Sequence, residues 1–129
     1  MTDRPTVVIA EDDFVIGEAL RLIVEREFDV LAVVEDGLAA LEAAAQRRPS
    51  IMLLDISLPL LRGFDAARAI RKQHPGIKLI FVSNYSERAY VEEARAIGAS
   101  GYVLKNRAAE ELPAAIRTAL AGEFFANEI

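Results

Sequence analysis

The sequence predicts an α/β fold of the doubly wound type, with one parallel sheet of five strands and helices on both of its faces. Two observations predict it. Short apolar runs and segments of helical period alternate five times along the 129 residues, strand first. Most of the runs are continuously apolar, which is typical of parallel strands that are buried on both faces. Strands joined through helices of this length imply right-handed crossovers within a single sheet.

Each predicted element follows from the local pattern. The predicted strands cover residues 6–10, 29–34, 51–54, 77–82 and 101–104. The predicted helices cover residues 14–27, 38–47, 63–73, 87–97 and 108–121. The buried face of the first helix is expected to hold the apolar residues Phe14, Ala19, Leu22 and Ile23. The second helix is stopped by Pro49, Ser86 is expected to cap the fourth, and Gly98 is expected to close it.

The composition excludes several classes of protein. A chain of 129 residues with 53% hydrophobic residues is long enough for one domain with a proper core. It has no cysteine, so neither a disulfide framework nor a thiolate metal site is available. Residues 1–5 are polar, unlike a signal sequence, and no apolar stretch has the length of a membrane span, so a cytoplasmic location is expected. The net charge of −5 gives no electrostatic footprint for nucleic acid.

Acidic, hydroxyl and basic side chains stand at the ends of four of the five predicted strands. The first strand is followed by Glu11 and Asp12, and the third by Asp55. The fourth leads into Ser83, and the fifth is followed by Lys105. Since ligands bind at the carboxyl ends of the strands in open α/β sheets, Glu11, Asp12 and Asp55 are expected to converge where the first and third strands lie side by side. Grouped carboxylates repel one another, so they indicate either a shared Mg²⁺ or, for the acidic run taken alone, an exposed turn.

Several motifs of the chain occur together in one known family. They are the pair Glu11-Asp12, the Asp55…Pro59…Gly63 loop, Ser83, and the segment 98–105 that ends in Lys105. With them the chain resembles a response-regulator receiver domain, the CheY-like phosphoacceptor of two-component signalling, over residues 5–121. Residues 119–125 are similar to the ends of receivers in NarL/FixJ-type (LuxR-type) transcription regulators. The resemblance implies a flavodoxin-like fold with strand order 2-1-3-4-5, which is the order known for this family.

The resemblance also implies a signalling domain that catalyses its own phosphotransfer and autodephosphorylation, and not a conventional enzyme. Asp55 would accept a phosphoryl group from a sensor histidine kinase or a histidine phosphotransfer protein. Lys105 would pair with oxygens of that group. The implied ligands of Mg²⁺ are Glu11, Asp12, Asp55 and the backbone carbonyl of Ser57.

Two further residues are implied to form a switch. Ser83 would donate a hydrogen bond to the phosphoryl group, and Tyr102 would rotate into the space that Ser83 vacates. An ordinary strand aromatic is the alternative for Tyr102. The switch is expected to change a surface around the fourth helix, which contains Tyr90 and Val91, together with the fifth strand and helix. Homodimers are expected on phosphorylation, either through this surface or through the first and last helices.

Other interpretations of the acidic residues are weaker. Asp13 continues the acidic run but is expected to begin a helix. Haloacid-dehalogenase-like phosphatases also use an aspartate after an apolar strand, but they need a second aspartate two positions on, where this chain has Ser57. A degenerate receiver that only binds proteins is disfavoured by the full set of acids, hydroxyl and lysine.

The receiver is expected to span residues 1–121, followed by a C-terminal tail or linker stub at 122–129 that is too short for a further element. Phe124 and Phe125 are expected to rest on the domain surface or on a neighbouring chain. We expect the regulatory domain of a DNA-binding transcription regulator, with no contact to nucleic acid or membrane by this segment itself. The alternative is a stand-alone receiver that acts through protein contacts or as a phosphate sink.

Overall fold

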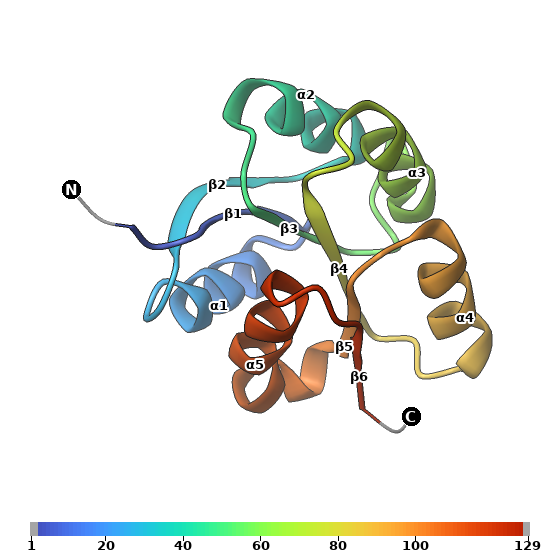
Figure 1. Cartoon of the computed structure of the whole chain (residues 1–129). Coiled ribbons are helices and arrows are strands. Elements are labelled where there is room, and N and C mark those ends of the chain that lie inside the picture. Colours follow the sequence, from blue (N-terminus) through green and yellow to red (C-terminus); the bar gives the residue numbers. More distant parts are fainter. Residues whose placement is uncertain (1–2, 128–129) are drawn as a thin grey trace.

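The computed structural model describes residues 3–127, and its centre is one parallel sheet of six strands (Figure 1). The strands are β1 (Thr6–Ala10), β2 (Asp29–Val34), β3 (Ile51–Leu54), β4 (Lys78–Ser83), β5 (Gly101–Leu104) and β6 (Phe125–Ala126). They are arranged in the order β2-β1-β3-β4-β5-β6. The predicted order of the first five strands is therefore confirmed, and a sixth strand extends the sheet beyond β5.

Five α-helices cover the sheet within the described residues. They are α1 (Phe14–Val24), α2 (Gly37–Arg47), α3 (Gly63–Gln73), α4 (Arg88–Ile97) and α5 (Ala108–Leu120), with a short 3₁₀ turn, η1 (Lys105–Arg107), before the last. Figure 1 shows α1 and α5 on one face and α2, α3 and α4 on the other. This is the three-layer arrangement that the alternation of strands and helices predicts.

The sheet separates two hydrophobic cores. Strand side chains that point to one face pack with α2, α3 and α4, in a cluster that includes Met52, Phe81 and Tyr102. Those that point to the other face pack with α1 and α5, and this cluster includes Leu53 and Val103. The four residues of β3 are all buried, which explains why its sequence is a continuous apolar run.

The strand register brings the strand ends to a common level. Ala10 pairs with Leu54, so the residues that follow β1 and β3 emerge side by side. Ser83 pairs with Leu104, which places the residue after β5 next to the end of β4. The convergence expected from the sequence therefore has its origin in backbone pairing.

The predicted buried face of α1 is wrong. The helix ends at Val24 and buries Gly17, Leu20 and Val24, at the spacing of one helical face. Phe14 is 75% exposed and Leu22 is 56% exposed. Ala19 is also exposed, and Ile23 is half-buried. The first helix carries apolar residues on more than one face, so hydrophobicity alone did not identify the one that meets the sheet.

The start of α4 also differs from the prediction. The residue before its first turn is Glu87, which makes no side-chain capping hydrogen bond, so Ser86 is not the cap. Its end is as expected, because Gly98 adopts the left-handed conformation with φ 92° and closes the helix. The loop from β4 to α4 is thus held by contacts other than a helix cap.

The expectation that the tail forms no further element is wrong. Phe125 and Ala126 pair with Gly101 and Tyr102, and the backbone N–H of Phe125 donates to Ser100 O at 3.0 Å. The two aromatics do rest on the domain, as expected: Phe125 packs against the α1–α5 core, and Phe124 lies against Arg95. The boundary at residue 121 stays a prediction, as does the wider division into receiver and tail.

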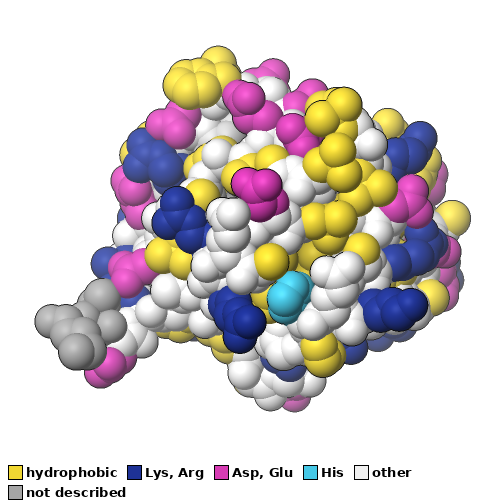
Figure 2. Space-filling view, turned by 90° about the horizontal axis from the view of Figure 1, so that it is seen from above, with side chains coloured by type: hydrophobic (Ala, Val, Ile, Leu, Met, Phe, Trp, Pro, Cys, Tyr) yellow, Lys and Arg dark blue, Asp and Glu magenta, His cyan; other side chains and the backbone are white. Residues whose placement is uncertain are grey.

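The surface seen from the side of α2 and α3 mixes charges of both signs with apolar side chains, and no basic stripe crosses it (Figure 2). Among residues 3–127, no helix is both long enough and apolar enough to span a bilayer.

Candidate functional site

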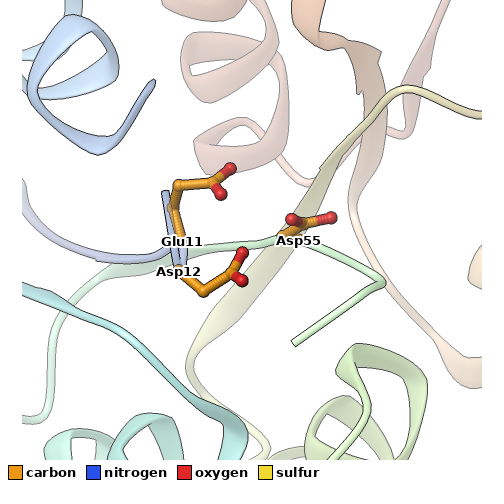
Figure 3. Close-up of side chains that lie close together, drawn as sticks. All are labelled: Glu11, Asp12 and Asp55. Carbon is orange, nitrogen blue, oxygen red and sulfur yellow. The ribbon is translucent and has the colours of Figure 1, made fainter. Parts of the chain in front are cut away.

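Three carboxylates meet at the carboxyl edge of the sheet. Glu11 and Asp12 follow β1 and Asp55 follows β3, and Figure 3 shows the first two directed toward the third. One oxygen from each lies within 4.8 Å of the others. Glu11 and Asp55 are buried, whereas Asp12 is exposed. The acidic run is therefore not merely a solvated turn, since one of its members is buried against another strand's carboxylate.

Lys105 lies between the two buried acids. Its Nζ is 2.7 Å from Glu11 Oε1 and 2.9 Å from Asp55 Oδ2. The ammonium donates a hydrogen bond to Asp55, but it is not aligned to donate one to Glu11. Among the described residues, Glu11 Oε1 thus has an ion-pair partner and no hydrogen-bond donor.

The protonation of the pair follows from burial and charge. Burial raises the pKa of Glu11, and repulsion from Asp55 adds to this, although contacts to Lys105 and to the Asp13 N–H oppose it. Burial alone would lower the pKa of Lys105, but its close contacts with the Glu11 and Asp55 carboxylates, at 2.7 and 2.9 Å, outweigh burial and raise it. The ammonium is therefore charged across the physiological range.

The loop after β3 fixes the Asp55 carboxylate. The backbone N–H of Ser57 donates to Asp55 Oδ1 at 3.1 Å, so each carboxylate oxygen has a donor. Gly63 closes the loop, because its N–H donates to Ile56 O at 2.9 Å. A Cβ at position 63 would lie 2.1 Å from the Asp55 carbonyl oxygen, so only glycine allows this approach. The position of the acid thus depends on a close backbone contact eight positions along the chain.

Ser83 and Tyr102 are linked through the backbone of the β4–α4 loop. Ser83 Oγ is buried and accepts a hydrogen bond from the Tyr85 N–H at 3.0 Å. Tyr102 is fully buried, and its hydroxyl donates to the Tyr85 carbonyl oxygen at 2.6 Å. Burial raises the pKa of Tyr102. The ring is buried in this structure, and its role as a switch stays a prediction.

Tyr85 is a residue of this site that the sequence analysis missed. Ser57 Oγ donates to the Tyr85 hydroxyl at 3.3 Å, which joins the loops after β3 and β4. The Tyr85 ring stacks on that of Tyr90 of α4, with 4.8 Å between centroids. The signal in the sequence was its place two residues after Ser83, at a strand end. Tyr85 therefore connects the acid loop, the hydroxyl, the buried Tyr102 and α4.

Asp13 has the role expected of it. Its Oδ1 accepts a hydrogen bond from the Ile16 N–H at 3.0 Å and caps α1. Its own N–H donates to Glu11 Oε2 at 3.0 Å. The backbone at the start of α1 thus helps to hold the buried acid.

Comparison with known proteins identifies the family of the chain. The family model for the response regulator receiver domain matches residues 7–117. The chain is 30% identical to the transcriptional regulatory protein LnrK of Bacillus subtilis (strain 168) over 118 residues, which cover 90% of this chain and 54% of LnrK. It is 33% identical to the transcriptional regulatory protein DegU of Brevibacillus brevis over 118 residues, with 90% and 50% covered. The chain spans about half the length of these curated relatives.

Solved structures give the same result. A LuxR-family two-component response regulator from Aurantimonas sp. SI85-9A1 superposes with a TM-score of 0.88 at 29% identity, covering 95% of this chain and 89% of that one. The signal receiver domain of NarL from Mycobacterium tuberculosis has a TM-score of 0.88 at 27% identity, with 95% and 100% covered. The resemblance inferred from the motifs is confirmed, and the chain belongs to the response regulator receiver domain family.

Proposed function

We propose that this receiver accepts a phosphoryl group on Asp55 from a sensor histidine kinase or a histidine phosphotransfer protein. The observation that carries the proposal is the buried Asp55 carboxylate, with Ser57 N–H at 3.1 Å from one oxygen and Lys105 Nζ at 2.9 Å from the other. A carboxylate held in one orientation is a competent nucleophile toward phosphorus. Family membership supports the same role.

In the proposed step, an oxygen of Asp55 forms a bond to phosphorus while the bond from phosphorus to the donor's histidine nitrogen breaks. The electron pair of the broken bond stays on that nitrogen. Lys105 neutralises charge on the carboxylate before the transfer and on the phosphoryl oxygens after it. The Ser83 hydroxyl, at the neighbouring strand end, is the proposed donor to the bound phosphoryl group.

The acidic residues fit a divalent cation. Three carboxylates, with oxygens within 4.8 Å of one another, and one ammonium leave an excess of two negative charges at the site when all are ionised. We propose Glu11, Asp12, Asp55 and the carbonyl oxygen of Ser57 as the ligands of Mg²⁺. When bound, Mg²⁺ supplies positive charge that offsets the carboxylates and the incoming phosphoryl oxygens.

The proposal is tested by incubation with acetyl phosphate and Mg²⁺, followed by intact mass measurement. The wild-type chain should gain one phosphoryl group, and Asp55→Asn should gain none. Asp13→Asn is the matched control, because it changes an adjacent acid that caps α1 and asparagine also caps helices. Labelling that persists in Asp55→Asn would disprove the assignment.

We further propose that residues 1–121 form the regulatory domain of a longer transcription regulator, with residues 122–129 leading onward. The support is that the relatives LnrK and DegU are transcriptional regulatory proteins about twice as long as the matched segment. A stand-alone receiver is the alternative. The first observation to make is whether the reading frame continues beyond Ile129. If it does, a pull-down of the phosphorylated and unphosphorylated full-length protein with its cognate promoter DNA tests the regulatory role.

For self-association, the α1–α5 face is the better of the two expected surfaces. The other surface is partly unavailable, because Tyr102 is buried and β6 covers the edge of β5. Val15 and Leu22 on α1 are 74% and 56% exposed. They line shallow grooves shared with Ala109 at the start of α5. We propose that phosphorylated chains pair through this apolar face.

A further inference from the structure

The segment after α5 returns to the sheet and closes its β5 edge. It runs as β6 between α4 and α5 (Figure 1), with Phe125 paired to Gly101 and Ala126 paired to Tyr102. A Cβ at position 101 would lie 3.2 Å from the Phe125 carbonyl oxygen, so glycine permits the close approach of the two backbones. We call residues 123–127 the strap.

Side chains of the strap reach the elements on both sides of β5. The Phe124 ring lies under the Arg95 guanidinium of α4, with 4.0 Å from Cζ to the ring centroid. Phe125 packs into the opposite core, with α1 and α5. Asn127 donates to Glu111 of α5. The strap is therefore fastened to three elements, α4, β5 and α5.

The Phe124–Arg95 contact lies on the same face of the sheet as Tyr102. Tyr102 points into the core beneath α3 and α4, and successive strand residues alternate between faces, so Phe124 and Phe125 lie on opposite faces. Tyr102 itself pairs with Ala126 of the strap at the β5 edge of the sheet, so a movement of Tyr102 would disturb this pairing. The paired β6 backbone and the Phe124–Arg95 contact cover that edge.

The buried Tyr102 is connected to the acid site by a chain of hydrogen bonds. The Tyr102 hydroxyl donates a hydrogen bond to the Tyr85 carbonyl oxygen, and the Tyr85 hydroxyl accepts one from the Ser57 hydroxyl. The Ser57 N–H in turn donates to the Asp55 carboxylate. The position of the Tyr102 ring therefore bears on the loops that surround Asp55. A contact that favours one position of the ring acts on the acid site through these groups.

We propose that the strap holds Tyr102 in its buried position, so that docking of residues 123–127 and phosphorylation of Asp55 favour one another. The part of this proposal that concerns phosphorylation rests on the proposed function, whereas the part that concerns Tyr102 does not. Coupling between two sites is reciprocal: if the docked strap favours the phosphorylated form, phosphorylation must tighten the strap by the same factor.

The test uses the full chain with Phe124→Ala/Phe125→Ala to loosen the strap and Glu123→Ala, an exposed residue of the same segment, as the control. Nitration of Tyr102 by tetranitromethane, read from peptide masses, reports its exposure without any phosphoryl group. The nitration rate should rise about tenfold in the double variant, because the share of molecules with the Tyr102 ring outside the core would grow from about 1% to about 10%. Glu123→Ala should match the wild type.

Beryllofluoride with Mg²⁺, as a phosphoryl mimic, provides the second measurement. Its half-saturating concentration should rise about fivefold in the double variant, the lower end of allosteric coupling. In the wild type it should slow amide exchange at Phe125 by a similar factor. An unchanged nitration rate together with unchanged beryllofluoride binding would overturn the proposal that the strap holds Tyr102. If the double variant does not fold, Arg95→Ala decides, because it removes only the contact to Phe124.

The two proposals fail in different ways. A wild-type chain that takes up neither beryllofluoride nor acetyl phosphate would overturn the phosphoacceptor role. The nitration measurement would then still decide whether the strap confines Tyr102, since it requires no ligand.

Discussion

Replacing Lys105 with alanine should strongly destabilise the domain, because it leaves two buried carboxylates facing each other. The side chains of Glu11, Asp55 and Lys105 are 1%, 7% and 11% exposed. At separations of 2.7 and 2.9 Å, each ion pair has a gross attraction of about 6 kcal/mol for an effective dielectric constant of about 20. The desolvation of the ammonium offsets several kcal/mol of this. We therefore expect Lys105→Ala to lower the free energy of unfolding by about 3 kcal/mol at neutral pH.

Urea denaturation in the presence of EDTA measures this loss, with Lys72→Ala as the control because Lys72 is an exposed lysine. Lys72→Ala should change the free energy of unfolding by about 0.5 kcal/mol or less. The double variant Asp55→Asn/Lys105→Ala should recover most of the loss, since it removes one of the two facing charges. A Lys105→Ala midpoint no lower than that of Lys72→Ala would refute the reasoning.

The pH dependence of Lys105→Ala provides a second check. Burial raises the pKa of Glu11 above that of the unfolded chain, so the folded state binds more protons between the two values. Stability then increases as the pH falls through the folded pKa toward the unfolded value of about 4.5. Losing Lys105 removes an influence that lowers the Glu11 pKa, so the gain in stability on acidification should be larger in Lys105→Ala than in the wild type. The difference in the free energy of unfolding between the wild type and Lys105→Ala should therefore shrink on mild acidification.

Three other predictions concern the metal, the acid loop and the self-association face. Millimolar Mg²⁺ should raise the melting temperature of the wild type by mass action, and Asp12→Asn should raise it without Mg²⁺ while removing most of the response; equal thermal shifts would place the metal elsewhere. In urea denaturation, Gly63→Ala should lower the free energy of unfolding by about 3 kcal/mol, because the added Cβ overlaps the Asp55 carbonyl oxygen. Gly76→Ala, where a Cβ meets no atom within 4 Å, should change it little. Similar losses in the two variants would mean that the loop after β3 adapts to the added methyl group. Leu22→Glu should prevent dimerisation with beryllofluoride in sedimentation velocity and Val91→Glu should not; the reverse result would favour the α4–β5–α5 surface.

The strands and the meeting of the acids were predictable because both depend on short-range pattern and on general rules for parallel sheets. Four of the five predicted strands have the observed bounds, and the strand predicted at 77–82 is shifted by one residue to Lys78–Ser83. Three of these four, β1, β3 and β5, are largely buried apolar runs, whereas β2 is only half-buried. Parallel strands also end at one edge, which brings Asp55 and Lys105 together although they are 50 positions apart.

The features that were missed depend on tertiary contacts. The two residues of β6 have no strand pattern of their own, and their pairing with β5 is a long-range contact that Gly101 makes easier. The buried face of α1 was predicted wrongly because apolar residues occur around the helix, and Leu20 and Val24 meet the sheet while Leu22 faces outward. Tyr85 lies in a loop, where no periodicity distinguishes a residue that bridges two strand ends.

Because the sheet divides the interior into two cores, a change in one core need not repack the other directly. Tyr102 and Val103 are neighbours on β5, but one belongs to the core beneath α3 and α4 and the other to the core beneath α1 and α5. A rearrangement of the Tyr102 ring therefore repacks the first of these cores directly. It reaches the second core through the strap, whose Phe125 packs there. The strap is thus a part of β5's surroundings through which the proposed switch would affect the packing of α1 and α5.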